Sequence, residues 1–189
     1  MNIRTNRKLP FWAIFALVAV LTLAIAVPGF ADDITGSATV TGGTLNMSAG
    51  DNPAFPETIL NGTDQTQSDS INISVSDLTG TGSGWNLQIT STTFANGTGR
   101  TLANNAISIT GASATCTSGT CTDPTNGTGY PLTVPADTTA PTAIKFFSAA
   151  ADTGMGQFTV SPSLQLSIPA DTFAGTYNST VTITSSSGP

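Results

Sequence analysis

The most informative absence in this sequence is that of histidine, since none of the 189 residues is one. Without histidine the chain cannot build the usual Ser/His or Cys/His pair of nucleophile and base. The acidic residues are mostly isolated aspartates in turn-like contexts, and no Asp-x-Asp-x-Asp spacing for calcium occurs. We therefore expect no catalytic residues, no metal site and no cofactor.

Charge is also scarce, and positive charge is the scarcest. The chain has five Lys and Arg residues, and three of them lie among the first eight residues. Residues 32–189 keep only Arg100 and Lys145 against 11 acidic residues, which gives a net charge of −9. Nucleic acid and anionic lipid are therefore poor partners, because both need a basic patch.

The N-terminal segment reads as an export signal. Arg4, Arg7 and Lys8 precede an apolar run of 17 residues, 11–27, which is followed by Pro-Gly-Phe-Ala. Small residues at positions 29 and 31 suit a signal peptidase, so we expect a signal peptide helix over 1–31 with cleavage after Ala31. We expect the rest of the chain, residues 32–189, to form one domain with no membrane segment. The run also reaches the lower limit for a bilayer span, so an uncleaved anchor is the alternative.

Only two cysteines are present, Cys116 and Cys121. In an exported chain such a pair is expected to form a local disulfide, which stiffens its own short loop more than the whole fold. A pair spaced in this way without further ligands is a poor metal site.

Alternation of apolar and polar residues predicts strands throughout. The clearest stretch is 71–89, where two alternating arms flank a Gly-rich turn and predict a hairpin. No amphipathic helix is evident beyond a brief helical turn at 149–155, so we predict an all-β, Ig-like or Greek-key β-sandwich. Further strands are expected at 34–40, 44–48, 55–60, 107–109, 130–134, 144–147, 158–160, 164–168 and 175–184, with loops at 61–69 and 110–129.

Two motifs resemble the WxL-domain surface proteins of Gram-positive bacteria. Trp85-Asn86-Leu87 is similar to the Trp-x-Leu motif, and the C-terminus is similar to the closing motif Tyr-x-x-Thr-Leu-Thr-Trp-Thr-Leu-x-x-x-Pro. Val181 replaces the first leucine, Ile183 the second tryptophan and Ser185 the second leucine. Matches to the closing motif occur at Tyr177, Thr180, Thr182, Thr184 and Pro189.

The resemblance implies a secreted surface protein that attaches non-covalently to peptidoglycan or another wall glycan, with other surface proteins as further candidate partners. The candidate contacts are Trp85, Leu87, Tyr177, Thr180, Thr182 and Thr184. If the family's second tryptophan contacts glycan, Ile183 removes that contact here. Two alternatives stay open: a surface-layer or fibre subunit that self-associates through strand edges, and a soluble carbohydrate-binding module.

The aromatic residues have two interpretations each. Trp85 and Tyr177 are either core residues of the sandwich or partly exposed rings that stack on a sugar. Phe94 and Tyr130 lie in predicted loop or short-strand regions, and we expect them to be better exposed.

Overall fold

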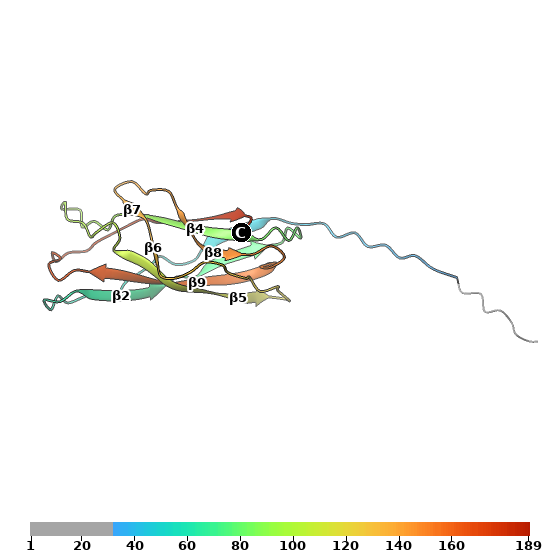
Figure 1. The fold of residues 1–189 in the computed structure, drawn as a ribbon, viewed down its shortest axis with the longest axis horizontal. Helices are drawn as coiled ribbons and strands as arrows, with labels where there is room; N and C mark the ends of the chain where they lie inside the picture. Colours follow the sequence, from blue (N-terminus) through green and yellow to red (C-terminus); the bar gives the residue numbers. More distant parts are fainter. Residues whose placement is uncertain (1–31) are drawn as a thin grey trace, which may run out of the picture. The chain divides into compact units, whose positions relative to one another are not determined.

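The computed structural model describes residues 32–189, which contain ten strands and no helix (Figure 1). Residues Val40–Pro189 form one compact unit, which contains all ten strands. The predicted signal peptide and its cleavage site lie outside the described residues. The strands are β1 (Leu45–Ala49), β2 (Gln65–Ser70), β3 (Ile73–Asp77), β4 (Trp85–Thr92), β5 (Ile107–Ser118), β6 (Leu132–Thr133), β7 (Ala136–Asp137), β8 (Ile144–Ala149), β9 (Gly156–Ile168) and β10 (Val181–Ser187).

The first sheet is built along β9, its longest strand. β5 pairs with one side of β9, and β2 and β3 lie end to end along the other side. β1 pairs with β3, and β6 pairs with β5. Pro162 lies in β9 where neither β2 nor β3 pairs with it, so its missing N–H leaves that side of the ladder intact. The two runs predicted on either side of Pro162 are therefore one strand.

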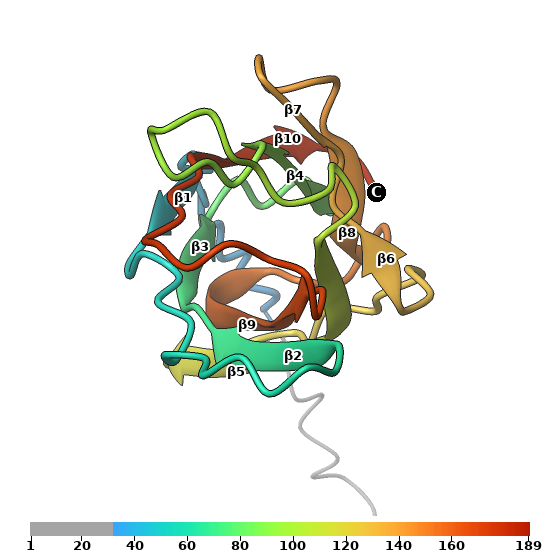
Figure 2. The ribbon, with the colours of Figure 1, turned by 90° about the vertical axis from the view of Figure 1, so that its left-hand side faces the viewer.

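The second sheet is built around β4. β10 pairs with one side of β4 over seven residues, while β8 and the short parallel strand β7 pair with the other side. Seen end-on, the two sheets enclose a single core (Figure 2), to which both contribute buried apolar side chains. The prediction of an all-β sandwich is confirmed.

The predicted hairpin at 71–89 is wrong in its pairing. Its two arms are strands, but β3 belongs to the first sheet and β4 to the second. The Gly-rich turn therefore crosses between sheets, with positive φ angles of 66°, 66° and 70° at Gly80, Gly82 and Gly84. Such angles are accessible to glycine at little cost. Alternation of apolar and polar residues identifies which face of a strand is buried, but it does not identify the neighbouring strand with which it pairs.

Other predicted boundaries were also wrong, for identifiable reasons. Residues 34–40 and 55–60 are not strands; the first has no partner strand among the described residues, and the second carries Pro56. Residues 61–69 and 110–129 were predicted as loops, but they contain most of β2 and most of β5. The inward-facing side chains of these two stretches are polar or small, so they show no apolar alternation. The last strand begins at Val181 rather than at 175. Ala149 ends β8, and residues 150–155 contain a turn rather than a helix. No helix in the described part could span a bilayer.

Candidate functional site

The residues singled out by the two motifs separate into a core group and a surface group. Trp85 and Leu87 are fully buried, with exposed fractions of 0%. Thr180, Thr182 and Thr184 are exposed, and Tyr177 is half-buried. Trp85 and Leu87 therefore offer no surface to a ligand, and their contribution is to hold β4 in the core.

Trp85 is fixed by two contacts. Its Nε1 donates a hydrogen bond to the Gly154 carbonyl at 2.9 Å, and its ring stacks on Phe147 with centroids 5.8 Å apart. Gly154 has φ +72°, and a Cβ added to it would lie 2.7 Å from Trp85 Nε1. The indole therefore fills a site that only glycine leaves open.

The predicted disulfide between Cys116 and Cys121 is present. Cys121 packs against Gly156 at the start of β9. The chain that follows is joined to the turn carrying Gly154, because Thr122 N donates to Met155 O and Gly154 N donates to Thr122 O. The disulfide thus supports the turn that lies over Trp85.

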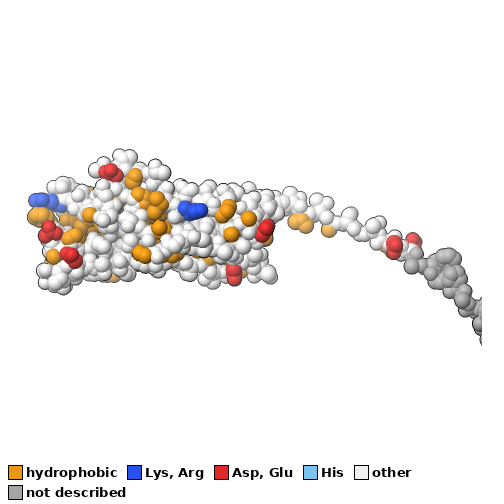
Figure 3. Space-filling model, viewed as in Figure 1, with side chains coloured by type: hydrophobic (Ala, Val, Ile, Leu, Met, Phe, Trp, Pro, Cys, Tyr) orange, Lys and Arg blue, Asp and Glu red, His pale blue; other side chains and the backbone are white. Residues whose placement is uncertain are grey.

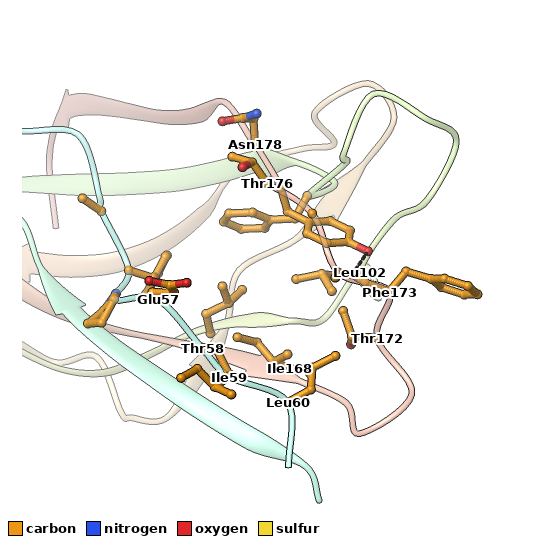
Figure 4. Close-up of a pocket in the computed structure, with 18 of the residues that line it drawn as sticks. Glu57, Thr58, Ile59, Leu60, Leu102, Ile168, Thr172, Phe173, Thr176 and Asn178 are labelled. Carbon is orange, nitrogen blue, oxygen red and sulfur yellow. Dashed lines mark hydrogen bonds between the residues drawn. The ribbon is translucent and has the colours of Figure 1, made fainter. Parts of the chain in front are cut away.

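A groove opens at the other end of the sandwich, with a volume of about 870 Å³ (Figure 4). One wall is the segment 53–60, which we call the strap. The strap runs beside β2, where Ala54 N donates to Asp69 Oδ2 at 2.7 Å and Gln65 Nε2 donates to Ile59 O at 3.0 Å. Pro53 and Pro56 have no N–H to donate, which disfavours a regular ladder here.

The second wall of the groove is the segment 172–178, immediately before β10. It is fixed to the loop after β4, because Ala95 and Asn178 exchange two backbone hydrogen bonds of 2.9 Å. Tyr177 OH donates to Phe173 O at 3.0 Å within the same segment. Both walls are therefore held by hydrogen bonds, and the remaining lining residues Phe94, Leu102, Leu166 and Ile168 come from the β4–β5 connection and β9.

Aromatic and aliphatic side chains dominate the groove. Phe55 meets Phe94 edge to face at 6.1 Å, and Ile59 and Phe173 keep 82% and 56% of their surface exposed. The Arg100 guanidinium lies 3.8 Å from the centre of the Phe173 ring. Large apolar side chains left in water in this way mark interaction sites.

The groove carries little charge, since Glu57 is its only ionisable carboxylate. Its polar groups are the side chains of Thr58, Thr172, Thr176 and Asn178 and neighbouring backbone amides. The Thr58 hydroxyl is buried and has no hydrogen-bond partner among residues 32–189. Figure 3 shows the same scarcity over the visible face, where charged side chains are few and separated. The groove therefore suits an uncharged ligand with apolar faces and some hydrogen-bonding groups.

Beyond the groove, β10 presents a row of hydroxyls. Thr180, Thr182 and Thr184 are exposed, while Val181 and Ile183 turn toward the core. Thr180 N donates to Thr92 Oγ1 at 2.8 Å, so the row begins next to β4. Because Ile183 faces inward, the position of the second motif tryptophan is a core position in this chain, and its replacement alters packing.

Two other aromatics differ from expectation. Phe94 is buried, with 8% exposure, so the expectation of an exposed ring is wrong. Tyr130 is half-buried; its hydroxyl donates to Phe146 O at 2.6 Å and accepts from Asn126 Nδ2 at 3.0 Å. Burial raises the pKa of Tyr130 above its ordinary value of 10.0, and the Asn126 hydrogen bond partly opposes that rise.

Most groove residues were not identified from the sequence. Tyr177 was named for its motif and Phe94 for its loop, whereas residues 55–60 of the strap were predicted only as a strand and Phe173 was not named. Two local features of the sequence could have pointed to them. Phe55 lies between two nearby prolines, and Phe173 is an isolated aromatic residue in a chain that has few aromatics.

Comparison with known proteins identifies the family. No curated protein and no solved structure matches the chain. The family described as "WxL domain surface cell wall-binding" matches residues 36–189, which includes every strand of the two sheets. Its Trp-x-Leu tripeptide is the start of β4, and its closing motif is β10 with the segment before it. The chain belongs to the WxL family of cell-surface, cell wall-binding domains.

Proposed function

We propose that this protein is exported and attaches non-covalently to peptidoglycan, and that the groove between the strap and residues 172–178 holds the glycan. The observation that carries the proposal is an open, nearly uncharged groove on a cell wall-binding domain, with the exposed ring of Phe173 at its outer rim (Figure 4). Sugars present apolar faces bordered by hydroxyls, which matches aromatic walls with amide and hydroxyl groups at their rims.

Charge argues against an electrostatic mode of attachment. Residues 32–189 carry a net charge of −9, so anionic wall polymers would repel the protein. We therefore expect retention on peptidoglycan to persist or to increase as salt screens that repulsion.

The hydroxyl row on β10 supplies a second set of contacts in this proposal. Thr180, Thr182 and Thr184 follow directly from the groove wall, so a glycan strand leaving the groove can continue along them. In this proposal Trp85 and Leu87 act indirectly, by fixing the strand on which β10 lies.

A pull-down on purified peptidoglycan tests the groove. Residues 32–189 should sediment with the polymer, and Phe173→Ser should reduce retention by about tenfold, the effect of losing roughly 1.4 kcal/mol. Leu78→Ser is the matched control, because Leu78 is similarly exposed at 50% but does not line the groove. Equal retention of the two variants would reject the groove, and preference for an unrelated soluble oligosaccharide would favour a carbohydrate-binding module.

Export is tested separately. We infer that the leader is removed after Ala31, so the mass of protein recovered from the cell surface should correspond to a chain beginning at Asp32. Recovery of the chain with residues 1–31 still attached would support the anchor instead.

A further inference from the structure

We propose that Arg100 is a specificity-determining residue of the groove, and that it binds a carboxylate on the peptide portion of peptidoglycan. This inference rests on the glycan-binding function proposed above and extends it from the sugar to a charged substituent beside it. The wall polymer would then be held by two kinds of contact, an uncharged one in the groove and an ionic one at its rim.

Arg100 lies next to the outer rim of the groove. Its guanidinium is 3.8 Å from the centre of the Phe173 ring, and Phe173 belongs to the groove lining. Figure 4 shows the Phe173 side chain at the outer end of the lining residues. A cation near the face of an aromatic ring is attracted by the electrons of that face. The ring therefore holds the positive charge of Arg100 close to the place proposed for the sugar.

The loop that carries Arg100 has a fixed shape. Asn96 Oδ1 accepts hydrogen bonds from Thr98 N at 3.0 Å, from Thr98 Oγ1 at 2.8 Å and from Arg100 N at 3.2 Å. Asn96 N in turn donates to Arg100 O at 3.0 Å. At the base of the loop, Ala95 exchanges backbone hydrogen bonds with Asn178 of the groove wall. One connected set of hydrogen bonds therefore positions both the arginine backbone and the wall that holds the ring.

The charge of Arg100 is not neutralised within the protein. Residues 32–189 contain 11 acidic residues, yet Arg100 forms a salt bridge with none of them, including Asp171 close to Phe173 in the sequence. Its guanidinium also donates no hydrogen bond to another residue of this part of the chain, and Arg100 is exposed. An arginine carries its N–H donors in a planar fork that matches a carboxylate. These donors are therefore available to a ligand.

The distribution of charge favours a single carboxylate over a polyanion. Arg100 and Lys145 are the only cations of residues 32–189, and Lys145 lies on β8 opposite Gln88 of β4. Figure 3 shows the positive charges as two separate patches. A polymer with closely spaced phosphates would meet one cation here and the repulsion of a net charge of −9. An isolated carboxylate, as the peptides of peptidoglycan supply, meets the same cation with less repulsion.

The groove also gives such a ligand a direction. Glu57 is the only carboxylate of the lining, and Figure 4 shows it on the side of the groove away from Phe173. A ligand carboxylate would be repelled by Glu57 and attracted by Arg100. The charged substituent is therefore expected at the Phe173 rim, with the uncharged sugar between the two walls.

Retention on peptidoglycan freed of phosphate polymers tests the proposal. We expect Arg100→Gln to reduce retention by about fivefold, and Arg100→Lys to give an intermediate loss because it keeps the charge without the fork. Lys145→Gln is the matched control, since it changes the net charge equally at an exposed site that does not line the groove. We expect it to be retained like the wild type.

Chemical modification of the polymer separates an ionic contact from a structural one. On peptidoglycan whose carboxylates have been converted to amides, wild type and Arg100→Gln should be retained equally. On unmodified polymer the gap between them should narrow at about 1 M salt, because an exposed ion pair is screened. A gap that stays the same on the amidated polymer would overturn the proposal, because it would show that Arg100 acts only through the Phe173 ring.

Two other results would also overturn it. A gap that appears only when the wall phosphate polymers are left in place would assign the contact to phosphate. Equal retention of Arg100→Gln and wild type on unmodified peptidoglycan, with Phe173→Ser still impaired, would reject Arg100 and leave the groove in place. If Phe173→Ser is also retained like the wild type, the groove itself is rejected, so failure of this inference is distinguished from failure of the proposed function.

Discussion

Replacing Gly154 by alanine should destabilise the fold far more than the same replacement at Gly80. Both glycines have positive φ, +72° and +66°, so each substitution forces alanine into the left-handed region. That conformational term is about 1–2 kcal/mol. Gly80 has nothing within 4 Å of the added methyl group, so Gly80→Ala isolates this term.

At Gly154 the methyl group also meets the core. The added Cβ would lie 2.7 Å from Trp85 Nε1 and still closer to the Ala149 side chain. Both neighbours are fully buried and packed, so neither can move freely. Overpacking of this kind costs about 1–3 kcal/mol. We therefore expect Gly154→Ala to lower the free energy of unfolding by about 2–5 kcal/mol in total.

Urea unfolding followed by fluorescence measures this difference directly. Trp85 is the only tryptophan in residues 32–189, so emission reports on the contact in question. With an m-value of about 2 kcal/mol/M, the midpoint should fall by about 1–2.5 M for Gly154→Ala and by about 0.5–1 M for Gly80→Ala. Equal midpoints for the two variants would refute the packing argument, and with it the view that the indole is fixed by the turn at Gly154.

Three further outcomes follow from the structure. Replacing Cys116 and Cys121 together by serine should lower stability by about 2 kcal/mol, since the closed loop is short, and reduction of the wild type should reproduce the shift in a thermal melt. The contribution of Tyr130 to stability should be constant below pH 10 and should be lost as the pH rises through its raised pKa, because ionisation is disfavoured in the folded state. Tyr130→Phe should flatten the fall in stability above pH 10, and an unchanged alkaline profile would contradict the assignment. Thr182→Ala and Thr184→Ala should leave the free energy of unfolding within about 0.5 kcal/mol of wild type yet reduce retention on peptidoglycan. Full retention would remove the hydroxyl row from the proposed contact.

The alternation of apolar and polar residues predicted the fold class well, because burial of one face of a strand produces this pattern within the strand itself. Ile73, Val75, Leu87 and Ile89 alternate in the sequence and are all buried in the structure. The pairing of those strands could not be predicted, since the same alternation fits any partner that covers the same face. The Gly-rich connection was read as a tight hairpin, but glycines with positive φ serve a crossing between sheets equally well.

The candidate site was predicted only in part. The motif residues Tyr177, Thr180, Thr182 and Thr184 lie at the surface, whereas Trp85 and Leu87 do not. Residues 55–60 of the strap were predicted as a strand, and the role of the strap as a groove wall was missed. That role depends on side-chain hydrogen bonds to β2, which carry no periodic signal. Residues 175–178 of the other wall were predicted as part of the last strand, because Tyr177 continues the alternation of Val181 and Ile183.

The direction of β10 has a consequence for how the domain is oriented. The strand leaves the groove at Thr180 and ends beside Gly84, and Gly43 enters the first sheet next to Leu78 at that same Trp85 end. Entry and exit of the chain thus share one pole of the sandwich, and the groove occupies the opposite pole. A polymer held at the groove would therefore contact the pole of the sandwich that lies farthest from Gly43 and Gly188.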